Sequence, residues 1–112
     1  MKALVVVDGG ICGFQTRIQA ESDDAQNVTF KIASACEKVR KFGEALQAKG
    51  PVDGYAEIGA GAQGVVLTTS NEALKGCCAG CAVHTGTFKA MQVAAGVALP
   101  KDVTIRIAQA EE

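Results

Sequence analysis

The order of apolar and polar positions predicts a short strand and then a β-hairpin in the first third of the chain. Residues 3–7 form a β-branched run that Asp8-Gly9-Gly10 stops, which is typical of a strand ending in a tight turn. Apolar and polar side chains then alternate over residues 14–21 and again over residues 28–32. A period of two indicates half-buried antiparallel strands. A turn at residues 22–24 joins them, so we expect a hairpin.

A helical period replaces this alternation after residue 34. Ser34-Ala35-Cys36-Glu37 has the form of a capping box, with a hydroxyl at the N-cap and a carboxylate three residues later. Apolar residues then recur at helical spacing until Gly50-Pro51 ends the element. These apolar residues are Ala35, Val39, Phe42 and Leu46. We therefore predict that Cys36 lies in the first turn of a helix that begins directly after a strand.

The second half of the chain has a weaker pattern. Residues 52–64 predict a loop or a short helix, and the apolar residues 65–67 fit either a strand or part of a buried helix. A helix with Thr85 or Thr87 as its N-cap follows, because apolar side chains recur at helical spacing as far as Leu99-Pro100.

The end of the chain completes the predicted fold. Residues 103–107 alternate once more and predict a last strand, followed by a frayed tail over residues 109–112. Together the elements predict a single domain over residues 1–112 of the α+β class. It would have an antiparallel or mixed sheet of three to five strands with two main helices on one face. Few aromatic residues and many Ala, Val and Gly suit helices that lie close on the sheet.

Charge and hydropathy exclude two classes of partner. Eleven basic residues nearly balance twelve acidic ones, and since no basic stripe is present we expect no nucleic-acid binding. The apolar run at residues 3–7 is far shorter than the about 20 residues that a membrane helix needs. It also lacks the basic leader and the cleavage site of a signal peptide. We therefore expect a cytoplasmic protein without a membrane partner.

Five cysteines stand out in such a chain. Disulfides are uncommon in a reducing cytosol, where clustered cysteines are more often metal ligands or redox groups. The cysteines come from three separate places, each at the end of a predicted element, and two of these places lie next to helix N-termini that favour a thiolate. The five are Cys12, Cys36, Cys77, Cys78 and Cys81.

The spacing of these cysteines predicts a metal site. Cys78-x-x-Cys81 has the commonest spacing for two sulfurs on one metal, and Cys77 can take the place of Cys78. Soft thiolate ligands select iron–sulfur clusters, zinc or Cu(I). We therefore predict that this cysteine loop contributes ligands to a [4Fe–4S] or [2Fe–2S] cluster or a related thiolate-bound metal, which Cys12 and Cys36 can join where the fold brings them together.

Other interpretations compete with the cluster. A free Cys is also a good small core residue, and Cys12 or Cys36 alone is often that. His84 can be a ligand or a proton donor, although a lone His near a helix N-terminus is more often a polar surface residue. The rival functions are a structural zinc module with the same ligands, a sulfur-handling protein with a persulfide on Cys81 or Cys36, and a partner-binding domain with incidental thiols.

A resemblance to a known family points in the same direction as the spacing. Cys12-Gly13 precedes a strand, residues 28–32 run into Cys36 and a helix, and Cys81 precedes a later helix. This order, over roughly residues 11–95, resembles the NifU/IscU-like iron–sulfur cluster scaffold family. The resemblance implies that the three cysteines are cluster ligands that converge at one end of the molecule. It also implies protein partners for cluster or electron transfer.

The chain departs from that family in four respects. Phe14 replaces the Asp that follows Cys-Gly, and His84 comes after the third cysteine and not before it. The chain opens with a strand in place of a helix, and Cys77 and Cys78 have no counterpart. These departures favour a cluster that is held by four cysteines and kept. The expected ligands of this [4Fe–4S] or [2Fe–2S] cluster are Cys12, Cys36, Cys81 and either Cys77 or Cys78.

The expected role is that of a carrier, a sensor or an accessory subunit. We see no catalytic base and no substrate motif, so an enzyme is the less favoured class, and a homo-oligomer stays open. The chain also resembles small uncharacterised proteins of anaerobes and methanogens, particularly over residues 89–102, and that likeness supplies no function.

Overall fold

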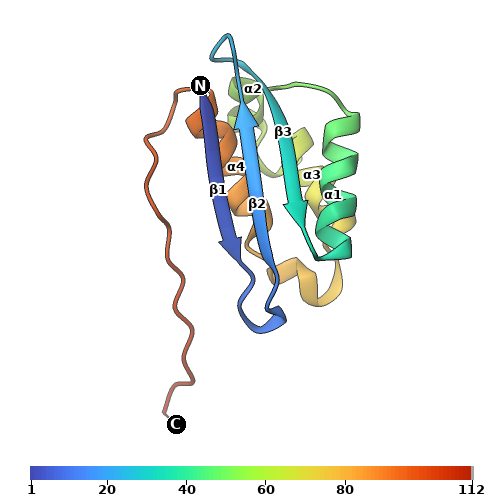
Figure 1. Cartoon of the computed structure of the whole chain (residues 1–112), viewed down its shortest axis with the longest axis vertical. Coiled ribbons are helices and arrows are strands. Elements are labelled where there is room, and N and C mark those ends of the chain that lie inside the picture. The colour runs from blue at the N-terminus through green and yellow to red at the C-terminus, as the bar shows by residue number, and fades with distance from the viewer. Residues whose placement is uncertain (112) are drawn as a thin grey trace.

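The structure is a computed structural model, and it describes residues 1–111. It has a four-stranded antiparallel sheet with four α-helices (Figure 1), which confirms the predicted α+β class. The strands are β1 (Lys2–Asp8), β2 (Gln15–Glu21), β3 (Asn27–Ser34) and β4 (Val52–Asp53). The helices are α1 (Glu37–Ala48), α2 (Gly54–Ala60), α3 (Val65–Ala73) and α4 (Val83–Ala94). Short 3-10 turns are η1 (Gly10–Cys12), η2 (Gly61–Gln63) and η3 (Gly76–Gly80).

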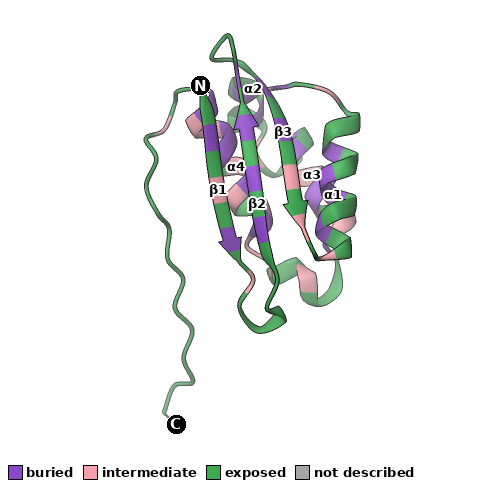
Figure 2. Ribbon diagram, in the orientation of Figure 1, coloured by how far each residue is buried: buried purple, intermediate pink, exposed green. Residues whose placement is uncertain are grey.

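The sheet has the order β1-β2-β3-β4, and each neighbouring pair is antiparallel. Ile18 in β2 lies opposite Val5 on one side and Ile32 on the other. The predicted hairpin is therefore confirmed. The alternation that predicted it arises because only one face of the sheet is covered (Figure 2).

All helices lie on the same face of the sheet (Figure 1). α4 packs against β1 and β2, and α1 packs against β3. Polar side chains such as Arg17, Gln19 and Lys31 occupy the open face. The largest fully buried side chains lie between the layers: Phe42, Ile18, Leu46, Met91, Val28 and Val66.

Two glycines allow the helices to approach the sheet closely. A Cβ atom added to Gly86 of α4 would lie 2.7 Å from Cγ2 of Val7. One added to Gly43 of α1 would lie 3.0 Å from Cβ of Ile32. Such distances leave no room for a methyl group, so glycine sets the spacing of the two layers at both positions.

A buried carboxylate decides the fold of the weakly patterned region. Glu57 of α2 is only 5% exposed. Its two oxygens accept the N–H groups of Val65 at 2.9 Å and of Val66 at 2.6 Å, the first residues of α3. This caps the free N–H groups of the helix, so residues 65–67 begin a helix and not a strand.

Neither main helix begins at the N-cap residue that the sequence predicts. The N-cap of α1 is Cys36, while Ser34 is paired with Thr16 in the sheet. The hydroxyl of Ser34 accepts the N–H of Cys36 at 3.2 Å and the hydroxyl of Thr16 at 2.9 Å. The N-cap of α4 is Ala82, so the predicted start at Thr85 or Thr87 is wrong.

The predicted last strand is also wrong. Residues 98–111 form neither helix nor strand, and the side chains of residues 99–111 are exposed (Figure 2). Alternation shows that a segment is able to form a strand, but pairing requires a sheet edge at hydrogen-bonding distance. Within the described residues, the segment 103–107 has no such neighbour.

Candidate functional site

The three cysteine-bearing segments lie at one end of the molecule (Figure 1). β1 and β3 both run toward this end, because each is antiparallel to β2. Cys12 follows β1, Cys36 follows β3, and Cys77–Cys81 connect α3 to α4. One direct contact joins two of the segments, since Nζ of Lys38 donates to the carbonyl of Lys75 at 3.1 Å.

Cys12 lies in the turn between β1 and β2. Gly10 has a φ of +74°, a conformation that glycine adopts without strain, and its N–H donates to Oδ1 of Asp8 at 3.1 Å. The Cys12 thiol lies 3.6 Å from the carbonyl oxygen of Gly9. A Cβ atom on Gly9 would lie 2.5 Å from Sγ. The sulfur of Cys12 therefore occupies the space that glycine leaves free, and the residue as a whole is exposed.

Cys36 is the N-cap of α1 and is half-buried against the hydrophobic core. Its carbonyl accepts the N–H of Arg40 at 2.9 Å, which is the first hydrogen bond of the helix. Its side chain makes no capping hydrogen bond. The sulfur thus stands at the start of α1, where N–H groups are available to a negative ligand.

The cysteine loop is a 3-10 turn between α3 and α4. Cys77 is exposed, whereas Cys78 and Cys81 are half-buried and pack against the core. The N–H of Cys81 donates to the carbonyl of Cys78 at 3.1 Å, which closes the C-x-x-C segment into one turn. The N–H of Val83 at the start of α4 donates to Sγ of Cys81 at 3.5 Å. His84 follows in the first turn of α4 and is half-buried.

Cysteine thiolates are suitable ligands for a soft metal, but the structure does not place them at coordinating distances around one point. All five cysteines are free thiols, and none is fully buried. No group of three or more His, Cys, Asp or Glu side chains that could hold a metal ion is present among residues 1–111. The fold therefore gathers the thiols at one end without closing them into a coordination shell.

The opposite end of the sheet carries the clearest electrostatic feature. Asp24, in the turn between β2 and β3, accepts hydrogen bonds from the side chain and N–H of Asn27, the N–H of Gln26 and the hydroxyl of Ser22. These hydrogen bonds, the one from the Asn27 side chain foremost, hold the pKa of Asp24 well below its ordinary value of 3.8. The turn is structural and lies away from the cysteines.

Sequence reasoning missed two residues that shape this architecture. The role of Gly9 was visible only as an Asp-Gly-Gly turn signal, because the contact with Cys12 depends on the turn geometry. Glu57 carried no local signal, since it caps a helix that begins eight residues later.

No helix among residues 1–111 is long and apolar enough to cross a membrane.

One family model matches the chain. The model of a family of unknown function, DUF6951, matches residues 3–107, which is nearly the whole length. Neither the curated proteins nor the solved structures contain a match for this chain.

Proposed function

The chain belongs to the DUF6951 family, and we propose that it binds an iron–sulfur cluster through thiolates at the cysteine-rich end of the molecule. The proposed ligands are Cys12, Cys36, Cys78 and Cys81. The protein then serves as a carrier, a sensor or an accessory subunit that meets protein partners at this end. Zinc on the same ligands is the alternative metal.

One observation carries the proposal: three segments far apart in the sequence bring free thiols to the same end of the sheet (Figure 1). A cysteine that only fills core space is fully buried. None of the five is, so each keeps part of its surface accessible. Accessible side chains at element ends on a rigid scaffold are where ligands are usually bound. The free thiols also favour a reducing compartment, and we propose the cytoplasm.

The choice of Cys78 over Cys77 rests on burial. Cys78 and Cys81 both pack against the core, in one turn closed by a backbone hydrogen bond. Cys77 is exposed instead. Two sulfurs that already share one side of a turn lose less conformational freedom on chelation, so Cys77 is the spare thiol.

Binding must include a closure of the loops. Since no three donors form a coordination shell among residues 1–111, metal binding and ordering of this end are coupled. Short 3-10 turns, with Gly10 and Gly76 at φ values of +74° and +70°, are segments in which such closure is feasible. When bound, a cluster would supply electron transfer or redox sensing, tuned by N–H groups such as that of Val83.

Reconstitution under anaerobic conditions with ferrous iron and sulfide tests the ligand set. We expect visible thiolate-to-iron absorption in the native protein, and loss of most of it in Cys36→Ser and Cys81→Ser. Cys77→Ser is the matched control and keeps the absorption. A zinc protein would stay colourless and bind about one zinc per chain. A native chain that shows no visible absorption and also binds no zinc would overturn the proposal.

A second candidate is sulfur handling by Cys81. The observation that favours it is the N–H of Val83 donating to Sγ, because hydrogen bonds to sulfur stabilise a negative charge there. The Cys81 thiolate would attack a sulfane sulfur of a persulfide donor, form a Cys81 persulfide and release the donor thiolate. Incubation with such a donor would then raise the mass of a metal-free protein by one sulfur, and Cys81→Ser would abolish the increase.

A further inference from the structure

β1 is a free edge of the sheet. It pairs only with β2 among the described residues, so the backbone groups on its other side have no partner in the sheet. The strand is seven residues long and contains no proline. Leu4 and Val6 project from its open face and are 52% and 47% exposed. Proteins usually protect such an edge with charges, proline or a covering segment, because it is a template for another strand.

The C-terminal tail is a strand sequence without a sheet. Beyond Val97 no backbone hydrogen bond is formed as far as residue 111. Val103, Ile105 and Ile107 alternate with polar residues and are 58%, 68% and 92% exposed. The tail extends past the body of the molecule (Figure 1), and the molecule with its tail measures 50 Å along its longest axis. Val103, Ile105 and Ile107 would share one face of an extended strand, so burying that face against another strand would be favourable.

We propose that residues 103–107 pair antiparallel with β1 of a second copy, and that two copies exchange their tails in a two-fold dimer. Each copy carries one free strand and one free edge, so the exchange satisfies both at once. The family match at residues 3–107 includes both parts and ends at the last residue of the alternating segment.

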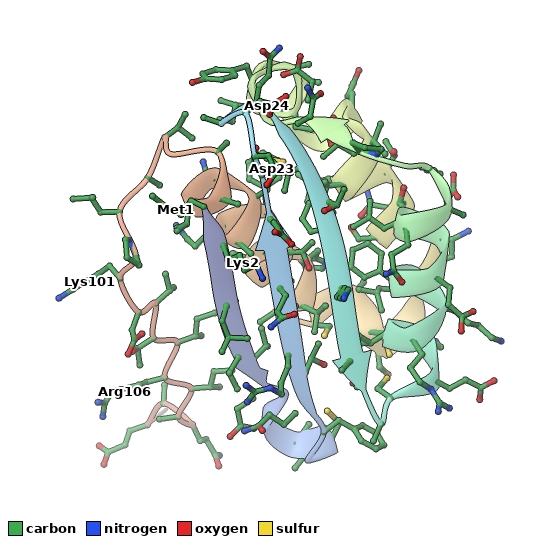
Figure 3. All side chains as sticks on the ribbon, turned by 45° about the horizontal axis from the view of Figure 1, so that its top comes forward. Met1, Lys2, Asp23, Asp24, Lys101 and Arg106 are labelled. Carbon is green, nitrogen blue, oxygen red and sulfur yellow. The ribbon has the colours of Figure 1, made fainter. Side chains whose placement is uncertain are left out.

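The direction of the tail favours a second copy over the chain's own β1. The tail runs in the same direction as β1 (Figure 1), with Lys101 on the side of Met1 and Lys2 and Arg106 further along (Figure 3). Pairing within the chain would therefore be parallel. Parallel pairs are slightly less stable per residue than antiparallel pairs, and every other pair of this sheet is antiparallel. A two-fold axis normal to the sheet makes β1 of the second copy run in the opposite direction. The tail of one copy and β1 of the other are then antiparallel, like every other pair in the sheet.

The side chains of the two segments match in this arrangement. With Ile105 opposite Val5 of the second copy, Val103, Ile105 and Ile107 fall on the helix-covered face, where Ala3, Val5 and Val7 also lie. Arg106 falls opposite Leu4 on the open face, where its aliphatic stem can cover the leucine.

The charges do not decide this register. Asp102 falls directly opposite Asp8 of the second copy, and like charges in that position are unfavourable. Lys101 lies next to this pair and reduces the repulsion, and exposed charges of this kind change the affinity little.

Light scattering coupled to size exclusion tests the exchange on the full chain. We expect a dimer for the native protein and a dissociation constant raised at least ~10-fold in Ile105→Pro, because proline removes a ladder hydrogen bond and is excluded from strand interiors. Ala110→Pro, outside the alternating segment, is the matched control and stays dimeric. The tail makes no backbone hydrogen bond in the isolated chain, so both variants should keep the helical circular dichroism signal and the thermal stability of the folded body.

Isotope-filtered NMR on a mixture of labelled and unlabelled chains identifies the strand that is paired. Contacts between Ile105 of one copy and Val5 of the other are expected. Contacts found only within one chain would overturn the exchange. A native protein that is monomeric at ~100 μM would overturn it as well, since that concentration corresponds to association weaker than about 5–6 kcal/mol. So would an Ile105→Pro variant that remains as dimeric as its control.

Discussion

At the scale of single residues, Gly9 and Cys12 determine the shape of the first cysteine turn. The sulfur of Cys12 lies where a side chain at position 9 would be, and the carbonyl oxygen of Phe14 lies 2.9 Å from the same point. A backbone oxygen cannot move aside as the end of a flexible side chain can. The position of the Cys12 thiol therefore depends on glycine at position 9.

We predict that Gly9→Ala lowers the free energy of unfolding by about 1–3 kcal/mol, because the added methyl group forces the turn apart. Urea unfolding of the metal-free protein measures this. Gly59→Ala is the matched control, since a Cβ atom there meets nothing within 4 Å. The control should be neutral or stabilising by up to about 1 kcal/mol. Equal effects of the two substitutions would contradict the contact.

At the scale of elements, α3 depends on a carboxylate from another helix. Glu57 supplies the acceptors that the first turn of α3 lacks, and Gly64 leaves room for it, because a Cβ atom there would lie 2.6 Å from Oε2 of Glu57.

We predict that Glu57→Gln destabilises the protein by about 1–2 kcal/mol, since the amide keeps one acceptor and turns a donor toward an N–H group. Chemical unfolding at pH 7 measures the change. Glu44→Gln, at an exposed position of α1, is the control and should cost less than about 0.5 kcal/mol. An equal loss in both variants would show that the cap does not stabilise α3.

The turn between β2 and β3 gives the protein a defined response to acid. Hydrogen bonds from Asn27, Gln26 and Ser22 lower the pKa of Asp24. A lowered pKa in the folded state means that the carboxylate form stabilises the fold. This contribution is fully present above the ordinary value of 3.8 and is lost as the pH falls below it toward the lowered pKa.

We predict that Asp24→Asn is less stable than the native protein at pH 7, and that the difference narrows as the pH falls below about 4. Urea midpoints at a series of pH values measure this. Asp23→Asn removes the same charge without these hydrogen bonds and serves as the control. A difference that is the same at pH 7 and pH 2.5 would contradict the role of Asp24.

The elements that sequence predicted correctly are those whose patterns are local. β2 and β3 pair as the alternation indicates, and α1 ends before Gly50-Pro51 as expected. Residues 65–67 could not be assigned, because the cap that makes them helical is Glu57. Ser34 was assigned to the wrong structure because its pairing with Thr16 in the sheet involves residues 18 positions apart.

The cysteines show the same division between local and distant information. Their placement at element ends was predicted from local signals and is what the structure has. Whether the three segments close on one metal depends on distances between loops, which a one-dimensional pattern does not contain. The alternation of residues 103–107 likewise indicated a strand but gave no partner for it.

At the scale of the whole molecule, two features stand apart from each other. The cysteine-rich end holds the free thiols, and the β1 edge with the C-terminal tail holds exposed apolar side chains such as Leu4, Val6 and Ile105. The proposed metal site and the proposed exchange are therefore tested separately. We expect Ile105→Pro to leave metal content per chain unchanged, and Cys36→Ser to leave the dimer intact.

The central claim is that the thiols bind metal in the native protein. The most direct measurement is the content of iron, zinc and acid-labile sulfide in protein purified without oxygen. We predict iron and sulfide in equal amounts, at two or four of each per chain, together with a brown colour. Protein that contains zinc without sulfide would show that the thiols form a zinc site and not a cluster. Protein that contains neither iron nor zinc would contradict metal binding by the thiols.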